Sequence, residues 1–241
     1  MKRFALIGRH LGHSWSQLWF TDLFAHLGLE GYSYTLHEMP TLDGLRRWVE
    51  EEEISGFNVT IPYKQAIIPL LDEITHEAET IGAVNCVCAS NGRLVGHNTD
   101  APAFANTIKH SIAANDTALI LGTGGAARAV GYAFAQMGIE HLHVSRHPEK
   151  HKHDNMKVIG YDHLPPSNLL VNATPVGMWP DVDSTPFPLP LSNFNFRLVY
   201  DLIYNPSPTL LLRQAAETGA VCMDGLAMLH RQAELSWKLW Q

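Results

Sequence analysis

The chain has 241 residues, of which 46% are hydrophobic and 17% charged, a balance typical of a globular protein of one or two domains. A net charge of −7 without any basic stripe argues against nucleic acid as a partner. Three cysteines without a CxxC pair fit a reducing compartment, and we find no signal peptide and no apolar run of about 20 residues, so we expect a cytoplasmic protein that does not enter membranes.

The front part of the chain alternates short apolar runs with helical patterns. Apolar residues at helical spacing predict helices over residues 16–27 and 42–53. Short apolar runs predict strands over residues 3–8, 32–39, 56–61, 83–89 and 93–97. The last two strands flank Asn91-Gly92, which is a strong signal for a hairpin.

Beyond residue 100 the alternation continues. It predicts helices over residues 101–112, 126–137 and 225–240, and strands over residues 117–121, 141–145, 169–172 and 198–201. The segment from Pro180 to Pro190 contains four prolines and is expected to be an ordered surface loop. Such alternation is typical of an α/β fold with parallel sheets and helices on both faces.

A glycine-rich sequence follows the strand at residues 117–121 and opens the next helix. It reads Gly122-Thr123-Gly124-Gly125-Ala126-Ala127, the G-x-G-x-x-G/A pattern of dinucleotide-binding loops in the context that this pattern requires. The first glycine allows a tight turn, and the second lets the backbone approach a pyrophosphate. The N–H groups at the start of the helix then bind the phosphates.

The end of the following strand predicts which dinucleotide is bound. NAD-binding chains of this type carry a carboxylate there for the ribose 2′-hydroxyl, whereas this chain has Ser145-Arg146-His147. Arg146 offers a permanent charge and paired N–H donors to a 2′-phosphate. The sequence therefore predicts NADP as the cofactor, the alternative being an arginine that is merely solvated.

Two charged residues follow strand ends in the front part of the chain. Lys64 comes just after the strand at residues 56–61, and Asp100 just after the strand at residues 93–97. Ligands of open α/β sheets bind at such carboxyl ends. A lysine ammonium held by a carboxylate can deliver a proton to the alkoxide that forms when hydride reduces a ketone. Solvated lysines and aspartates are also common at such positions.

The 14 histidines of the chain raise the question of a metal site. His141 and His143 alternate along one predicted strand, and His151 and His153 lie in a polar loop. Neither pair has a cysteine or carboxylate at a known ligand spacing, so we expect no metal.

Further motifs occur in a fixed order between residues 8 and 233. They are His13-Ser14-Trp15-Ser16, Gly56-Phe57-Asn58-Val59-Thr60-Ile61-Pro62-Tyr63-Lys64, Gly82-Ala83-Val84-Asn85, Asn98-Thr99-Asp100, Asn172-Ala173-Thr174-Pro175-Val176-Gly177-Met178, Asp201-Leu202-Ile203-Tyr204, and Gly225-Leu226-Ala227-Met228-Leu229-His230-Arg231-Gln232-Ala233. Together with the glycine loop, these motifs resemble those of the shikimate dehydrogenase family.

The resemblance implies an NADPH-dependent oxidoreductase of aromatic amino acid and chorismate biosynthesis, which reversibly reduces 3-dehydroshikimate to shikimate. It implies that Lys64 is the catalytic acid/base group and that Asp100 is its catalytic partner. Substrate-binding roles fall on Ser14, Ser16, Thr60, Asn85, Tyr204 and Gln232. Cofactor-binding roles fall on Gly122, Thr123, Gly124, Gly125, Ala126, Ser145, Arg146, Asn172, Thr174, Gly177, Met178, Gly225 and Met228.

The expected architecture consists of two α/β domains with a cleft between them. Residues 1–100 and 223–241 would form the substrate-binding domain, and residues 101–222 a Rossmann-type NADP-binding domain. The expected partner is the small-molecule substrate, and the chain is expected to be a monomer or a homodimer. Two alternatives are a quinate/shikimate dehydrogenase that uses NAD, against which Arg146 argues, and a non-catalytic sensor of shikimate-pathway ligands, against which Lys64 and Asp100 argue.

Overall fold

The computed structural model describes residues 1–12, 14–152 and 154–241. His13, which begins the paired-serine motif, and His153, one of the two loop histidines considered as metal ligands, therefore lie outside the described residues. The chain divides into two compact units, the first made of Met1–Ala103 with Leu229–Gln241 and the second of Phe104–Met228.

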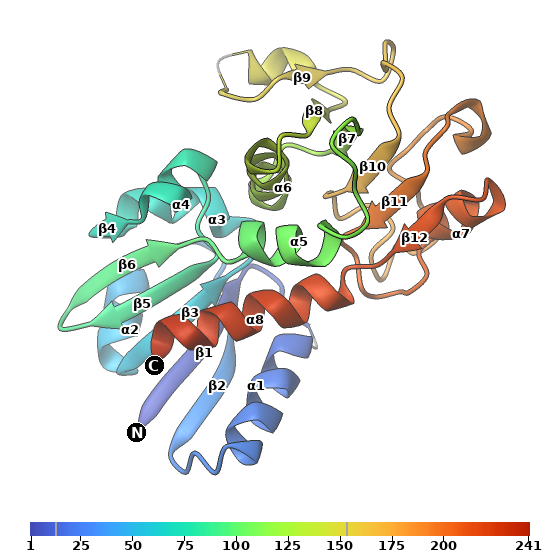
Figure 1. The fold of residues 1–241 in the computed structure, drawn as a ribbon. Coiled ribbons are helices and arrows are strands. Elements are labelled where there is room, and N and C mark those ends of the chain that lie inside the picture. The colour runs from blue at the N-terminus through green and yellow to red at the C-terminus, as the bar shows by residue number, and fades with distance from the viewer. Residues whose placement is uncertain (13, 153) are drawn as a thin grey trace. The chain divides into compact units, whose positions relative to one another are not determined.

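The first unit is built on a mixed six-stranded sheet (Figure 1). Its strands are β1 (Lys2–Gly8), β2 (Tyr32–Glu38), β3 (Ile54–Val59), β4 (Glu73–Ile74), β5 (Cys86–Ser90) and β6 (Arg93–His97). Their order is β2-β1-β3-β5-β6-β4, and β5 is antiparallel to both of its neighbours. The antiparallel pairing of β5 with β6 arises because Asn91 and Gly92 both adopt positive φ and close the predicted hairpin.

Helices cover both faces of this sheet. One face carries α1 (Trp15–His26) and α8 (Leu226–Trp240), and the other carries α2 (Leu45–Glu51), α3 (Tyr63–Ala66), η1 (Ile68–Leu70) and α4 (His76–Ile81). A Cβ on Gly56 would lie 2.5 Å from Nε1 of Trp240, so this glycine lets α8 lie directly against β3. The same indole nitrogen donates to the carbonyl of Val87 over 3.0 Å.

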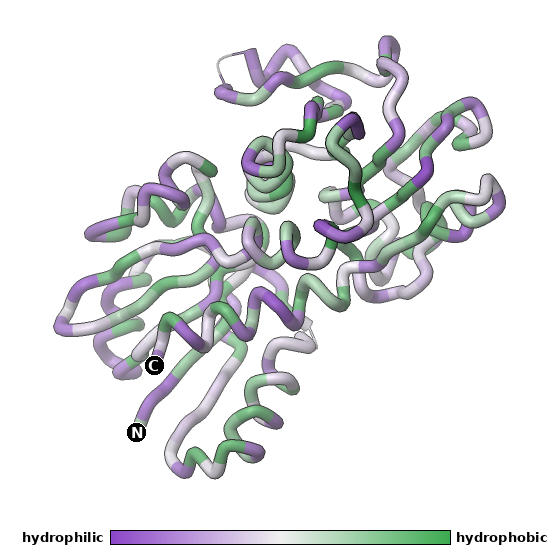
Figure 2. Tube along the Cα trace, in the orientation of Figure 1, coloured by the Kyte–Doolittle hydropathy of each residue, from purple (hydrophilic) through white to green (hydrophobic). Residues whose placement is uncertain are grey.

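The second unit contains an all-parallel six-stranded sheet. Its strands are β7 (Thr117–Leu121), β8 (Glu140–Val144), β9 (Val158–Ile159), β10 (Leu169–Asn172), β11 (Leu198–Asp201) and β12 (Val221–Met223). Their order is β9-β8-β7-β10-β11-β12, the 3-2-1-4-5-6 arrangement of the Rossmann fold. Green, apolar stretches mark this sheet and its neighbouring helix in Figure 2, as buried parallel strands require. The predicted α/β fold class is confirmed.

Helices cover one face of this second sheet, and a helix together with a loop segment covers the other. On one face Phe104 of α5 (Asp100–Ile108) contacts Phe134 of α6 (Gly125–Gln136) and Tyr200 of β11. On the other face lie α7 (Leu210–Glu217) and the segment around η3 (Leu191–Asn193). Phe187, which is 2% exposed, belongs to this core, so the segment expected as a surface loop also covers the sheet.

Some helices are shorter than the sequence predicts. The helix expected over residues 42–53 spans Leu45–Glu51, because Gly44 precedes it with φ of 80°, outside the helical region. The helix expected over residues 101–112 ends at Ile108. Within the described ranges, no helix has the length and apolarity needed to cross a membrane.

Candidate active site

Polar residues from four segments meet at one edge of the first sheet. β1, β3 and β6 all end at this edge, whereas the antiparallel β5 begins there. Ser14 follows β1, Lys64 follows β3, Asn85 directly precedes β5, and Asp100 follows β6 after two residues. The polarity of the strands therefore brings these predicted residues to the same edge.

Lys64 and Asp100 form a shielded ion pair at this edge. Nζ of Lys64 lies 2.6 Å from Oδ2 of Asp100, and their side chains are 16% and 6% exposed. Nδ2 of Asn85 donates to Oδ1 of the same carboxylate over 2.8 Å. Because two donors point at Asp100, it is held as a carboxylate acceptor, and Lys64 carries the proton.

The orientation of the Asn85 amide is fixed by Thr99. Its Oδ1 accepts from the backbone N–H of Thr99 over 2.6 Å, and its Nδ2 lies 2.9 Å from the hydroxyl of Thr99. The second N–H of this amide is the one that donates to Asp100. Both amide protons are thus engaged, and exchanging the oxygen and nitrogen positions would break the bonds to Asp100 and to the backbone N–H of Thr99.

A buried serine on α8 completes this network, although the sequence analysis did not single it out. Ser236 is fully buried, donates to the carbonyl of Gln232 over 2.9 Å and accepts from Nδ2 of Asn58 over 2.8 Å. Since its single proton is already used, its 3.3 Å contact with the hydroxyl of Thr99 has Thr99 as the donor. Tyr34 in turn donates to Oδ1 of Asn58 over 2.8 Å.

The predicted substrate-binding hydroxyls make local contacts. Ser14 caps the start of α1, where its hydroxyl accepts from the backbone N–H of Ser16 over 3.2 Å. Thr60 follows β3, and a Cβ on Gly8 would lie 2.7 Å from its methyl group, so the ends of β1 and β3 are close together. Gln232 lies one turn before Ser236 on α8, and its amide donates to its own helix.

The second unit holds the glycine loop between β7 and α6. Gly122 has φ of 106°, and a Cβ there would lie 3.1 Å from the methyl group of Thr174. Nothing lies within 4 Å of a Cβ added to Gly124, so space is left for a close approach by a phosphate. Gly125 and Ala126 form the first turn of α6, whose N–H groups have no acceptor within the helix. This loop fits a dinucleotide pyrophosphate.

A buried histidine of β8 contacts the backbone of the glycine loop. His143 is 2% exposed, and its Nδ1 lies 3.1 Å from the carbonyl oxygen of Gly122. Burial lowers the pKa of His143 from its usual 6.5 to about 4, so the ring is neutral and Nδ1 can carry the donated proton. A Cβ on Gly131 of α6 would lie 2.7 Å from Nε2, so this glycine makes room for the ring.

The lowered pKa of His143 predicts acid sensitivity. Between about pH 6.5 and pH 4 the unfolded chain binds a proton that the folded chain excludes, so stability is full above this window and falls by up to about 3 kcal/mol as the pH drops through it. Urea unfolding across this range should show a shallower pH dependence in His143→Gln than in wild type. His141→Gln, on the same strand, is the control, and equal slopes in wild type and His143→Gln would contradict this account.

A second buried polar group organises the segment after β10. Asn172 is fully buried, and its Oδ1 accepts from the backbone N–H of Thr174 over 2.9 Å and from its hydroxyl over 2.7 Å. Its Nδ2 donates to Asp201 over 2.9 Å. Burial raises the pKa of Asp201 to about 6, while a hydrogen bond from Thr209 acts in the opposite direction. The predicted residues Asn172 and Thr174 are therefore held rigidly.

Other predicted cofactor residues also follow strands of this sheet. The hydroxyl of Ser145, just after β8, accepts from the backbone N–H of His147 over 3.1 Å, and Arg146 between them is exposed. After β10, Gly177 has φ of 95°, and Met178 is 42% exposed. Exposure leaves Arg146 and Met178 accessible to a ligand.

Three predicted residues lie near the end of the second unit. Tyr204 follows β11, and burial raises the pKa of its phenol. The backbone N–H of Gly225 donates to the carbonyl of Ile203 over 3.1 Å, so the two segments touch through their backbones. Met228, on α8, is 6% exposed.

The two units thus offer complementary chemistry. The first holds a lysine ammonium poised as a proton donor, and the second holds a loop that fits a dinucleotide. No group of three or more His, Cys, Asp or Glu residues in the described part of the chain is arranged to hold a metal ion. A proton donor and a dinucleotide site are what hydride transfer to a ketone requires.

Known proteins match the chain along its whole length. Residues 6–87 match the family described as shikimate dehydrogenase substrate binding domain. A shikimate dehydrogenase (NADP(+)) from Trichormus variabilis is 38% identical over 99% of this chain and 90% of its own length. One from Thermus thermophilus is 38% identical over 100% of this chain and 92% of its own length.

Solved structures share the fold as well as the sequence. The shikimate 5-dehydrogenase of Thermus thermophilus in complex with NADP(H) and shikimate has a TM-score of 0.89 and 36% identity, covering 100% of this chain and 94% of that chain. Shikimate dehydrogenase 1 from Peptoclostridium difficile has a TM-score of 0.89 and 36% identity, covering 100% and 92%. These matches confirm the family resemblance predicted from the motifs.

Proposed function

The chain belongs to the shikimate dehydrogenase family, and on that premise we propose that it interconverts 3-dehydroshikimate and shikimate with NADP(H). It is an oxidoreductase that acts on a ketone and the corresponding secondary alcohol. The observation that carries this proposal in the chain itself is the shielded ion pair of Lys64 and Asp100, 2.6 Å apart at the edge where the strands of the first sheet end.

Lys64 is the acid/base group of the proposed reaction. During reduction its ammonium donates a proton to the ketone oxygen, and during oxidation the amine accepts that proton back. Asp100 keeps the ammonium charged and in place. Asn85 donates a hydrogen bond to the other oxygen of the same carboxylate and so stabilises its negative charge. When bound, the nicotinamide supplies the hydride in one direction and accepts it in the other.

The substrate is held, in this proposal, by short polar side chains. Ser14, Ser16 and Thr60 donate to its carboxylate, and Tyr204 is a further substrate-binding residue. Asn85, Asp100 and Gln232 contact the ring hydroxyls. A small polyhydroxylated acid needs several such donors and acceptors at fixed positions. Residues 1–100 and 223–241 accordingly form the proposed substrate-binding domain.

Residues 101–222 form the proposed NADP-binding domain. The pyrophosphate is bound by the loop Gly122, Thr123, Gly124, Gly125 and Ala126, and the phosphorylated ribose by Ser145 and Arg146. The nicotinamide side is lined by Asn172, Thr174, Gly177, Met178, Gly225 and Met228. The open space at Gly124 and the fixed segment after Asn172 support these assignments.

A steady-state assay tests the proposed function directly. Shikimate and quinate are each offered with NADP and with NAD, and the absorbance of the reduced nicotinamide is followed. We expect the highest kcat/KM for shikimate with NADP. Preferred turnover of quinate with NAD would instead favour a quinate dehydrogenase, and binding of shikimate without any turnover would favour a sensor.

Coenzyme preference depends on Arg146 in this proposal. Arg146→Ala should weaken NADP binding about tenfold, because a charge-assisted contact to the 2′-phosphate is lost, and should leave NAD binding nearly unchanged. Equilibrium titration with both coenzymes measures the two effects in one variant. An equal loss of affinity for NADP and for NAD would show that Arg146 does not bind the 2′-phosphate.

A further inference from the structure

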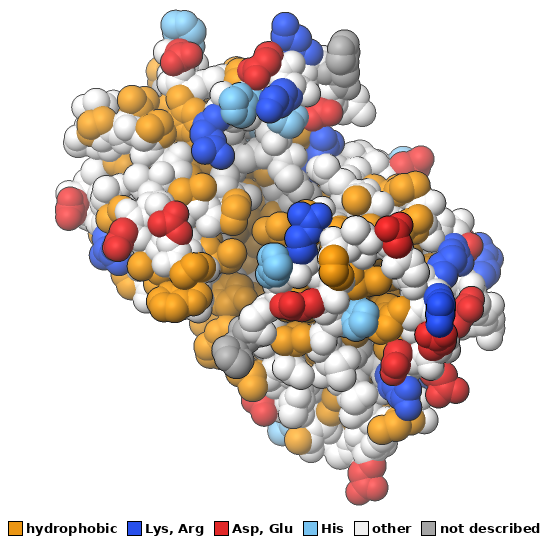
Figure 3. Space-filling model, turned by 180° about the vertical axis from the view of Figure 1, so that it is seen from behind, with side chains coloured by type: hydrophobic (Ala, Val, Ile, Leu, Met, Phe, Trp, Pro, Cys, Tyr) orange, Lys and Arg blue, Asp and Glu red, His pale blue; other side chains and the backbone are white. Residues whose placement is uncertain are grey.

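The segment after β8 is rich in basic side chains and lies beside the glycine loop. Arg146, Lys150 and Lys152 are exposed on it, and Figure 3 shows lysine, arginine and histidine side chains gathered at the upper end of the second unit. As far as it is described, this segment forms only the short η2 (Pro148–His151) before β9. Side-chain contacts with the glycine loop and α6 help to hold it in place, in addition to the pairing of β8 with β9.

Two contacts provide this attachment, and a third within the segment links them. Nε2 of His151 lies 3.2 Å from the hydroxyl of Thr123, the residue between the first two glycines of the loop. Nδ1 of the same ring lies 2.8 Å from Oδ2 of Asp154. Arg128, in the second turn of α6, donates from Nη2 to the same oxygen over 3.0 Å. The side chains of Arg128, His151 and Asp154 are 19%, 22% and 30% exposed, so the group is only partly screened by water.

The direction of these bonds follows from the chemistry of the partners. A carboxylate only accepts, so Nδ1 of His151 carries the proton that is donated to Asp154. In the neutral ring Nε2 is then an acceptor, and the hydroxyl proton of Thr123 points at it. In the charged ring both nitrogens donate, and the hydroxyl proton of Thr123 is released for another acceptor.

We propose that His151, held by Asp154, is a coenzyme-specificity residue that binds the 2′-phosphate of the dinucleotide as an imidazolium. As the phosphate arrives, the ring takes up a proton from solvent at Nε2 and donates it in a hydrogen bond to the phosphate, and on release the proton returns to solvent. The freed hydroxyl of Thr123 donates to the same ligand. This inference rests on the proposed NADP-dependent function.

The positions of His151 and Thr123 support a role at the phosphorylated ribose. Thr123 follows β7, and Ser145 and Arg146 follow its neighbour β8, so all three lie at the carboxyl edge of adjacent parallel strands. This is where Rossmann domains read the 2′ position of the ribose. His151 reaches the same edge through its contact with Thr123.

The charges around His151 explain why protonation should be coupled to binding. Asp154 favours the imidazolium, whereas Arg128 of α6 and the neighbouring Lys150 and Lys152 oppose it. His143 of β8 lies near Arg128 and His151 as well, and it stays neutral because burial lowers its pKa to about 4. The positive neighbours thus oppose the effect of the Asp154 carboxylate on the ring. A dianionic phosphate adds negative charge and so shifts the protonation equilibrium of His151 towards the imidazolium.

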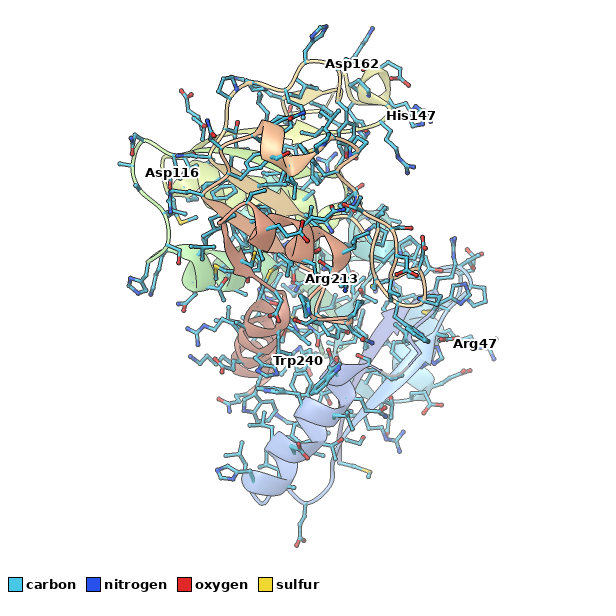
Figure 4. The ribbon with its side chains drawn as sticks, turned by 90° about the vertical axis from the view of Figure 1, so that its right-hand side faces the viewer. Arg47, Asp116, His147, Asp162, Arg213 and Trp240 are labelled. Carbon is cyan, nitrogen blue, oxygen red and sulfur yellow. The ribbon has the colours of Figure 1, made fainter. Side chains whose placement is uncertain are left out.

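Calorimetric titration of the full chain with NADP and with NAD tests the proposal. We compare wild type, His151→Gln, Asp154→Asn and the control His147→Gln, which removes an exposed imidazole from the same segment; Figure 4 labels His147 at the edge of the second unit. Measurements run from about pH 6.5, above the second ionisation of a phosphate, to about pH 8.5, so that they cover the range in which an imidazolium paired with a phosphate dianion would lose its charge.

For wild type and His147→Gln, we expect the Kd for NADP to rise at least about tenfold across this range, and NADP binding to take up protons, visible as a dependence of the heat on the buffer. His151→Gln should bind NADP about tenfold more weakly at the lower pH and lose most of the pH dependence, and Asp154→Asn should behave similarly. Unchanged NAD binding shows that each variant retains its folded loop.

Two results would overturn the proposal. One is an unchanged pH dependence of NADP binding in His151→Gln. The other is the same pH dependence for NAD in wild type, lost in His151→Gln, which would place the imidazole at the pyrophosphate. Neither bears on the proposed function, which the shikimate assay tests separately.

Discussion

Lys64→Ala should lower kcat for shikimate oxidation at least about a hundredfold, the loss typical of a missing general acid/base group. The ammonium lies 2.6 Å from Asp100, and its side chain is 16% exposed, so water does not readily replace it in the same position. Steady-state kinetics with saturating NADP measure the effect. Lys64→Met, which keeps the apolar stem of the side chain, should show the same loss.

The control for this experiment is the affinity of each variant for NADP. Titration of either variant with NADP should give wild-type affinity, because the coenzyme contacts proposed here belong to the second unit, and the backbone carbonyl of Lys64 still accepts from Val84 over 2.7 Å. Activity within a few-fold of wild type would exclude Lys64 as the proton donor. Loss of NADP binding would show that the substitution acts through the fold instead.

The sequence predicted the second sheet well because its strands are short, apolar and sharply bounded. β7, β10 and β11 coincide with the predicted ranges, since each is a buried run that ends at glycine or polar residues. Most elements that were not predicted are short, although the eight-residue α7 was missed as well. α4 has six residues and β9 has two, so their patterns are too brief to show a period.

The proximity of Lys64 and Asp100 could be anticipated because both follow strand ends, and parallel strands end at one edge of a sheet. The contact between Thr99 and Ser236 could not, because 137 positions separate these residues and nothing local to α8 indicates which strand it covers. Similarly, His143 looked like one of many histidines until its ring was found beneath the carbonyl of Gly122.

Buried polar residues recur in this chain as the link between fold and site. Asn85 fixes the carboxylate of Asp100, and Asn172 fixes the segment after β10. Each amide is at most 2% exposed, so a lost hydrogen bond is not replaced by water and costs more than a surface contact. Besides any ligand contact of their own, these two side chains therefore determine the geometry of the groups next to them.

The largest loss of stability should follow Gly225→Ala. A methyl group there would overlap the carbonyl oxygen of Leu202 and lie 2.5 Å from its carbonyl carbon, and both obstacles are backbone atoms that cannot rotate away. The segment before α8 would have to move away from β11, breaking the bond between Gly225 and Ile203. We expect the free energy of unfolding to fall by about 3 kcal/mol, as measured by urea denaturation.

Gly124→Ala is the matched control, because nothing lies within 4 Å of its added Cβ and its φ of −75° suits alanine. Its unfolding free energy should change by no more than about 1 kcal/mol, the size of an N-cap effect. Its affinity for NADP should nevertheless fall at least about tenfold, because the methyl group occupies the space that a pyrophosphate needs. A Gly225→Ala protein as stable as wild type would mean that the two backbone segments separate at little cost, and a Gly124→Ala protein that binds NADP normally would move the pyrophosphate away from this loop.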